Sequence, residues 1–143
     1  MPSHLAPREQ SHRFTILLID DDQQDRTYWS NALRSAPYGY AVLEADSGES
    51  GFDLFRKHAV DCVVLDLDMP ESGFFTLLQL IPDCDRPQVA VVILTKLMQP
   101  TLLNLAKTNG AYACLIKHVC SLEELTKTIQ QAIASVKSME NGA

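Results

Sequence analysis

The fold of this chain is decided by the stretch Cys62-Val-Val-Leu-Asp-Leu-Asp-Met-Pro70. Its first four residues form an apolar run without polar alternation, which indicates a strand covered on both faces. The acids Asp66 and Asp68 follow that run closely. In an open α/β sheet, ligands bind beyond the carboxyl ends of the strands, so these acids lie where a site is expected.

Four further apolar runs are rich in β-branched residues and have the length of strands: Phe14–Ile19, Tyr40–Ala45, Gln88–Leu94 and Tyr112–Ile116. Segments with helical spacing alternate with them. This alternation predicts an α/β fold, in which a parallel sheet carries helices on both faces. Because crossover connections are right-handed, few topologies remain. We expect a flavodoxin-like, doubly wound, five-stranded parallel sheet of order 2-1-3-4-5 with five helices.

Three local signals mark helix boundaries. Ser47 is predicted to cap the second helix, and Asn109-Gly110 is typical of a helix end. Ser121-Leu-Glu-Glu124 is a capping box that opens the last helix. The predicted organisation is a flexible N-terminal segment, one domain and a short C-terminal tail, at residues 1–12, 13–137 and 138–143.

Composition excludes several classes of protein. With 143 residues, 46% of them apolar, the chain has the size of one folded domain. Its formal net charge is −6 and its basic residues are scattered, which argues against direct nucleic-acid binding. The apolar runs are far shorter than the roughly 20 residues of a membrane-spanning helix, and residues 1–12 lack the apolar middle of a signal peptide. We therefore expect no membrane segment, a cytoplasmic location and reduced cysteines.

Polar groups are predicted to gather at the carboxyl edge of this sheet. Asp20-Asp21-Asp22 end the first strand, Asp66 the third, Thr95 the fourth and Lys117 the fifth. Clustered carboxylates repel each other unless a cation neutralises them, and hard oxygen ligands at an open site suit Mg²⁺. A metal, a lysine and a hydroxyl around one further carboxylate predict a phosphoryl-transfer site with that carboxylate as nucleophile.

Each of these residues also has an ordinary structural interpretation. Acids after strands often form turns or cap helices, a threonine there is usually a cap, and a lysine near a strand end is usually solvated. Asp68 could be a turn residue before Met69-Pro70. The functional interpretation depends on all of these residues occurring together, each at the end of a predicted strand.

Four ordered motifs carry a family resemblance, and they run Ile16-Leu-Leu-Ile-Asp-Asp-Asp22, Val63-Val-Leu-Asp-Leu-Asp-Met-Pro70 with Gly73, Val91-Val-Ile-Leu-Thr95, and Gly110-Ala111 with Leu115-Ile-Lys117. From about Phe14 to Val136, the chain resembles the receiver domain of two-component response regulators and hybrid sensor kinases. The resemblance covers nearly all of the predicted domain.

The resemblance implies a role for each residue around the phosphoryl group. Asp66 would be the phospho-acceptor, Thr95 would hydrogen-bond the phosphoryl group and Lys117 would pair with it. The donor would be a phospho-histidine of a sensor histidine kinase or a histidine phosphotransfer protein. The domain would catalyse its own phosphotransfer and a slow autodephosphorylation without being an enzyme. Phosphorylation would switch partner interactions, and the face of helix 4, strand 5 and helix 5 could form a homodimer.

The resemblance also implies a Mg²⁺ site beside Asp66. Asp20 and Asp21 would form its acidic pair, with Asp21 as the more direct ligand. Asp66 would be a further ligand, and the backbone carbonyl of Asp68 would complete the protein's share of the coordination. Asp22 is an alternative ligand, because with three consecutive acids the family's acidic pair can be aligned in two ways, one residue apart.

Three residues depart from the family pattern. Cys114 stands where a tyrosine or phenylalanine usually precedes the lysine, His118 replaces the usual proline, and Lys96 replaces a small residue after Thr95. The pattern therefore predicts intact chemistry with an unusual readout.

Two other functions fit part of the sequence. A pseudo-receiver would keep the fold as a binding module without phosphorylation, which Cys114, His118 and Lys96 favour. A haloacid-dehalogenase-type phosphohydrolase also carries Asp-x-Asp at a strand end, as Asp66-Leu-Asp68 does. Those enzymes place that motif in the first strand and their metal acids late, whereas here the acids come first.

Overall fold

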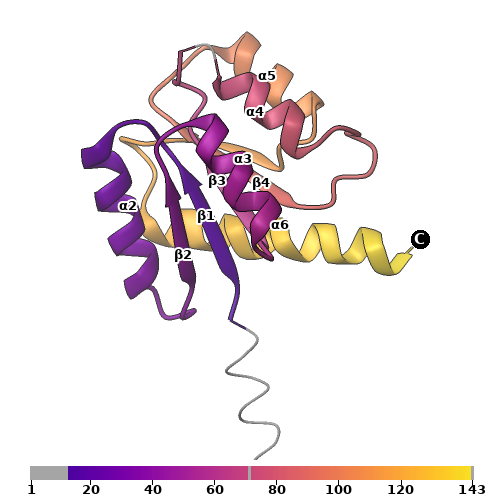
Figure 1. The fold of residues 1–143 in the computed structure, drawn as a ribbon, viewed down its shortest axis with the longest axis horizontal. Coiled ribbons are helices and arrows are strands. Elements are labelled where there is room, and N and C mark those ends of the chain that lie inside the picture. The colour runs from indigo at the N-terminus through magenta and orange to yellow at the C-terminus, as the bar shows by residue number, and fades with distance from the viewer. Residues whose placement is uncertain (1–12, 71, 143) are drawn as a thin grey trace, which may run out of the picture.

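The computed structural model describes residues 13–70 and 72–142. It contains a sheet in which all paired strands are parallel, in the order β2-β1-β3-β4-β5 (Figure 1). The strands are β1 (Thr15–Ile19), β2 (Ala41–Ala45), β3 (Cys62–Leu65), β4 (Ala90–Thr95) and β5 (Ala113–Ile116). The predicted strands and their order are confirmed. The segment 1–12, expected to be flexible, lies outside the described residues.

The part of the chain that the structure describes has five helices, as predicted. They are α2 (Gln23–Ser35), α3 (Gly48–Lys57), α4 (Gly73–Leu80), α5 (Pro100–Thr108) and α6 (Leu122–Gly142). Helices α3, α4 and α5 pack on one face of the sheet, and α2 and α6 pack on the other (Figure 1). None of these described helices has both the length and the apolar character needed to cross a bilayer.

Side chains of the central strands divide between two apolar layers. Successive residues of a strand point to opposite faces of the sheet. Leu17 and Ile19 pack toward α3, α4 and α5, whereas Ile16 and Leu18 pack toward α2 and α6. All four are almost completely buried. This is why the strands lack polar alternation in the sequence.

The strand register brings the residues after the strands to one edge of the sheet. Ile19 lies beside Leu65 at the ends of β1 and β3. Backbone hydrogen bonds extend one residue further, because the Asp66 amide donates to the Ile19 carbonyl at 3.0 Å and the Lys117 amide donates to the Thr95 carbonyl at 2.9 Å. The first residue after each of these strands is therefore held as firmly as the strand itself.

The predicted helix boundaries are confirmed by their caps. Ser47 Oγ accepts a hydrogen bond from the Ser50 amide at 3.0 Å, and Ser121 Oγ accepts one from the Glu124 amide at 3.0 Å. Asn109-Gly110 follows the last residue of α5, and Gly110 has a φ of 108°. This positive φ favours glycine, as expected at a helix end.

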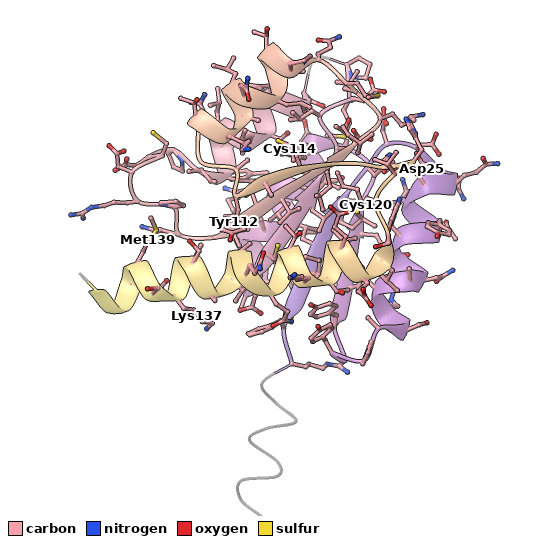
Figure 2. The ribbon with its side chains drawn as sticks, turned by 180° about the vertical axis from the view of Figure 1, so that it is seen from behind. Asp25, Tyr112, Cys114, Cys120, Lys137 and Met139 are labelled. Atoms are coloured by element: carbon pink, nitrogen blue, oxygen red, sulfur yellow. The ribbon has the colours of Figure 1, made fainter. Side chains whose placement is uncertain are left out.

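The end of the last helix differs from the prediction. The polar stretch 138–143 was expected to be a tail, but α6 continues to Gly142. Residues Ser138, Met139 and Glu140 include neither glycine nor proline, so no strong helix breaker precedes Gly142. Figure 2 shows Lys137 and Met139 along this continuous helix, and Lys137 Nζ lies 5.8 Å from the centre of the Phe14 ring.

Gly73, at the start of α4, lies against the backbone of the loop after β3. A Cβ atom at this position would lie 2.5 Å from the Leu67 carbonyl oxygen and 2.9 Å from the Leu67 Cα atom. Because buried backbone yields less readily than the end of a side chain, we expect Gly73→Ala to lower the free energy of unfolding by about 2–3 kcal/mol in urea denaturation.

Gly39→Ala is the control for this effect. A Cβ atom at Gly39 would meet no atom within 4 Å, and its φ is 69°. Gly39→Ala should lower the free energy of unfolding by only about 1 kcal/mol, because the backbone conformation is its one unfavourable feature. Equal losses in the two variants would contradict the steric explanation for Gly73.

Candidate functional site

The ammonium group of Lys117 lies among three carboxylates at the carboxyl edge of the sheet. Its Nζ atom donates to Oδ2 of Asp20 at 2.7 Å, to Oδ2 of Asp66 at 2.8 Å and to Oδ2 of Asp25 at 2.8 Å. The side chains of Lys117, Asp20 and Asp66 are 5%, 2% and 3% exposed. Three residues singled out in the sequence thus meet in one buried pocket.

Backbone amides hold the second oxygen of each buried carboxylate. The Asp22 amide donates to Oδ1 of Asp20 at 2.9 Å, and the Asp68 amide donates to Oδ1 of Asp66 at 2.8 Å. Aspartate commonly accepts such a bond from the residue two positions later, which turns the chain after the strand. Asp20 and Asp66 are therefore oriented by their own loops as well as by Lys117.

Burial and charge pairing act on the pKa values of this pocket in opposite directions. Burial raises the pKa of Asp20, because desolvation outweighs the hydrogen bonds from Lys117 and the Asp22 amide. Burial alone would lower the pKa of Lys117, but its hydrogen bonds to Asp20, Asp25 and Asp66 outweigh desolvation and raise it. Lys117 is therefore a fixed positive charge at neutral pH.

The raised pKa of Asp20 predicts how stability depends on pH. A carboxyl group with a raised pKa holds its proton more tightly in the folded protein, so it stabilises the fold below its ordinary pKa of 3.8 and loses this contribution as pH rises through the folded value. As the pH is lowered from about 7 to about 4, we expect the free energy of unfolding of the wild type to rise relative to that of Asp20→Asn. Urea denaturation in EDTA measures this difference, and a constant or falling difference would contradict the prediction.

Thr95 ends β4 at the same edge and is fully buried. Its Oγ1 atom accepts a hydrogen bond from the Leu97 amide at 3.2 Å. The loop after β4 therefore turns back over the hydroxyl group. A hydroxyl that accepts a hydrogen bond can also donate one, so Thr95 can donate to a ligand bound at this edge.

The acids at the rim of the pocket differ in their contacts. Asp22 caps α2, because its Oδ1 accepts a hydrogen bond from the Asp25 amide at 3.0 Å, which lowers the pKa of Asp22. Its Oδ2 also lies 4.0 Å from Nζ of Lys96. Asp21 and Asp68 are exposed. Asp22 therefore already has a structural role as a helix cap, whereas Asp21 has an exposed side chain.

Two pocket residues were not singled out in the sequence. Asp25 supplies the third carboxylate on Lys117, and Nη1 of Arg26 donates to the Asp20 carbonyl at 2.7 Å. Figure 2 shows Asp25 at the amino end of α2, beside the loop that follows β5. The sequence position of Asp25 could have indicated its place in the site. The first turn of a helix that follows a strand lies at the same sheet edge as the end of that strand.

Cys114 lies on β5, at the position where the family resemblance implied an aromatic residue. It is half-buried against α5, and its Sγ atom lies 3.6 Å from the Leu103 carbonyl oxygen. Burial raises the pKa of its thiol. A small apolar side chain thus takes the place of an aromatic ring between β5 and α5, while His118 is exposed beyond the strand.

The pocket residues have the donor chemistry of a Mg²⁺ site. Within residues 13–70 and 72–142, no three acidic, histidine or cysteine side chains are gathered as ligands of one metal ion. The point on which Asp20, Asp25 and Asp66 converge is the Lys117 ammonium. These three carboxylates carry more negative charge than the single ammonium neutralises, and Asp21, one residue after Asp20, has an exposed side chain. Hard oxygen donors with surplus negative charge fit Mg²⁺.

Comparison with known proteins gives the same family by sequence and by structure. The family model for the response regulator receiver domain matches residues 16–130. Two-component response regulator ORR3 of Oryza sativa subsp. indica is 30% identical over 121 residues, which cover 83% of this chain and 88% of ORR3. A receiver domain protein from Clostridium thermocellum is 30% identical with a TM-score of 0.77, over 87% of this chain and 97% of that structure.

Other relatives are much longer than this chain. The CAI-1 autoinducer sensor kinase/phosphatase CqsS of Vibrio cholerae is 27% identical over 120 residues, which cover 82% of this chain but only 17% of CqsS. The chemotaxis response regulator CheY4 of Vibrio cholerae, in contrast, is covered over 98% of its chain at 27% identity, with 83% of this chain covered and a TM-score of 0.71. Similarity is therefore to a domain that occurs alone and within larger proteins.

Proposed function

The chain belongs to the response regulator receiver domain family, and on that premise we propose that it accepts a phosphoryl group on Asp66 in a Mg²⁺-dependent reaction. The observation that carries the proposal is the placement of the Asp66 carboxylate. It is buried at a strand end, held by the Asp68 amide and paired with Lys117. A carboxylate fixed in this way can attack a phosphorus atom without first losing conformational freedom.

In the proposed reaction, a carboxylate oxygen of Asp66 attacks the phosphorus of a phospho-histidine. The new O–P bond forms as the N–P bond breaks, and the electron pair of that bond returns to the imidazole of the donor. Lys117 offsets charge on the phosphoryl oxygens, and the Thr95 hydroxyl donates to one of them. Asp66 and Lys117 directly follow β3 and β5, and Thr95 is the last residue of β4.

Mg²⁺, when bound, would neutralise charge on the phosphoryl group during transfer. Asp20, Asp21 and Asp66 would hold it with the backbone carbonyl of Asp68. We favour Asp21 over Asp22, because Asp22 caps α2. Water would then slowly hydrolyse the acyl phosphate, which returns the Asp66 carboxylate and releases inorganic phosphate. The chain is a signalling domain rather than an enzyme in the usual sense.

The phosphoryl donor in this proposal is a sensor histidine kinase or a histidine phosphotransfer protein. The resulting charge of roughly −1.5 to −2 on Asp66 would bias the loop after β4 and helix α5 between two arrangements. A homodimer through α5, β5 and α6 is one proposed readout. We also propose a cytoplasmic location and no direct contact with nucleic acid.

Incubation of the purified chain with acetyl phosphate tests this function. With Mg²⁺ we expect the intact mass to increase by one phosphoryl group, and with EDTA we expect no increase. Purified phospho-histidine proteins should transfer the same group. Absence of any increase under both donors would favour the pseudo-receiver alternative, and steady release of phosphate from a generic phosphate ester would favour a phosphohydrolase.

A further inference from the structure

The three N–H donors of the Lys117 ammonium are all engaged. They donate to Asp20, Asp25 and Asp66 at 2.7–2.8 Å, and a lysine ammonium has three donors and no acceptor. A phosphoryl group on Asp66 brings oxygens that need cationic partners. Phosphorylation turns the Asp66 carboxylate into an acyl phosphate, so the N–H that now donates to Asp66 can pass to a phosphoryl oxygen of the same side chain. A second N–H of Lys117 can reach the phosphoryl group only by leaving Asp20 or Asp25.

Asp25 is the carboxylate whose release costs least. Its side chain is 31% exposed, whereas those of Asp20 and Asp66 are 2% and 3% exposed. If Asp20 were released instead, its buried carboxylate would depend on another cation, because water cannot solvate it there. Asp25 lines a surface depression with Tyr28 and Lys117, so water can replace the ammonium there.

The position of Asp25 on α2 lowers this cost further. Asp25 lies in the first turn of the helix, behind the Asp22 cap. The backbone N–H groups of a helix amino end favour negative charge. The negative charge of Asp25 is therefore still stabilised by the helix amino end after its hydrogen bond with Lys117 is broken.

We propose that Asp25 is a positioning residue that competes with the phosphoryl group for Lys117. In the resting protein, Asp25 holds the third N–H of Lys117. When Asp66 is phosphorylated, that N–H passes to a phosphoryl oxygen and Asp25 turns to solvent. The carboxylate of Asp25 thereby sets how tightly the phosphorylated state is held. This inference rests on the proposed role of Asp66 as phospho-acceptor.

Beryllofluoride with Mg²⁺, a stable mimic of the phosphoryl group, tests this competition. Tryptophan fluorescence of Trp29, which lies on the same helix, gives the midpoint of a titration. We expect Asp25→Ala to bind beryllofluoride roughly three- to tenfold more tightly than the wild type, because one charged hydrogen bond no longer opposes binding. Asp25→Asn, which keeps a neutral acceptor, should fall between the two. Structural damage would weaken binding, so a gain separates the proposed role from a merely structural one.

Asp22→Asn is the matched control, because it removes the same charge from the same end of α2. Asparagine caps helices as well as aspartate does, and the described contacts of the Asp22 side chain are with the Asp25 amide and Lys96. The affinity of the Asp22→Asn variant for beryllofluoride should change by less than about twofold, since exposed charges are screened.

Three outcomes would overturn the inference. Unchanged or weaker binding in both Asp25 variants would show that Asp25 does not compete for Lys117. A gain in Asp22→Asn equal to that of Asp25→Ala would show an effect of net charge alone. If the wild type itself does not bind beryllofluoride, the proposed phospho-acceptor function fails as well, so the two failures are told apart by the wild-type titration.

Discussion

Replacing Asp66 with asparagine is expected to abolish Mg²⁺-dependent phosphorylation of this chain. The amide keeps the size of the carboxylate, and its oxygen can still accept the hydrogen bond from the Asp68 amide. It lacks the negatively charged oxygen that attacks phosphorus. The mass increase after treatment with acetyl phosphate should therefore fall from one phosphoryl group to none.

Asp61→Asn provides the matched control for the Asp66 variant. Asp61 precedes β3, at the opposite end of the strand that Asp66 follows, and its Oδ2 accepts a hydrogen bond from the Thr15 amide at 2.8 Å. Asparagine can accept the same bond, so we expect phosphorylation to proceed as in the wild type. Continued labelling of Asp66→Asn would show that another residue is the acceptor.

Replacing Lys117 with methionine is expected to destabilise the protein by about 3–5 kcal/mol at neutral pH without Mg²⁺. The change leaves the carboxylates of Asp20 and Asp66 buried without their shared cation. Methionine keeps the length of the apolar stem, so the loss reports on charge rather than packing. Urea denaturation gives the free energy of unfolding.

The Lys117→Met variant should also respond to conditions in a characteristic way. Mg²⁺ should restore more stability to it than to the wild type, because the metal supplies the missing positive charge. Lowering the pH should narrow its deficit, since protonated carboxyl groups no longer repel each other. Phosphorylation should be strongly reduced even where the variant is folded.

Lys96→Met is the control for the loss of a positive charge near the pocket. The Lys96 side chain is 48% exposed and lies 4.0 Å from Asp22. We expect a loss below about 1 kcal/mol, as for other exposed ion pairs. If both lysine variants lose the same stability, the buried cluster does not depend on Lys117 in the way described.

Most of the fold could be predicted from the sequence, because both faces of the sheet are covered. In strands such as Cys62–Leu65 every residue is apolar and buried, so the strand can be recognised as one continuous apolar run in the sequence. Caps at Ser47 and Ser121 fixed two helix starts. The end of α6 was predicted too early, since a polar helix end and a polar tail have similar compositions.

The site could be predicted in part. Asp20, Asp66, Thr95 and Lys117 each follow or end a strand, so the strand order alone places them together. Asp25 could not be placed in the same way, because its contact with Lys117 depends on the angle and side-chain direction of α2.

The most direct test of the central claim is to locate the phosphoryl group on the chain. Borohydride reduces an aspartyl phosphate to homoserine, so treatment of the acetyl-phosphate-labelled protein followed by peptide sequencing in a mass spectrometer identifies the modified residue. We predict homoserine at position 66 after labelling with Mg²⁺ and none after labelling with EDTA. Homoserine at Asp20, Asp21 or another acid, or labelling that does not depend on Mg²⁺, would contradict the proposed function.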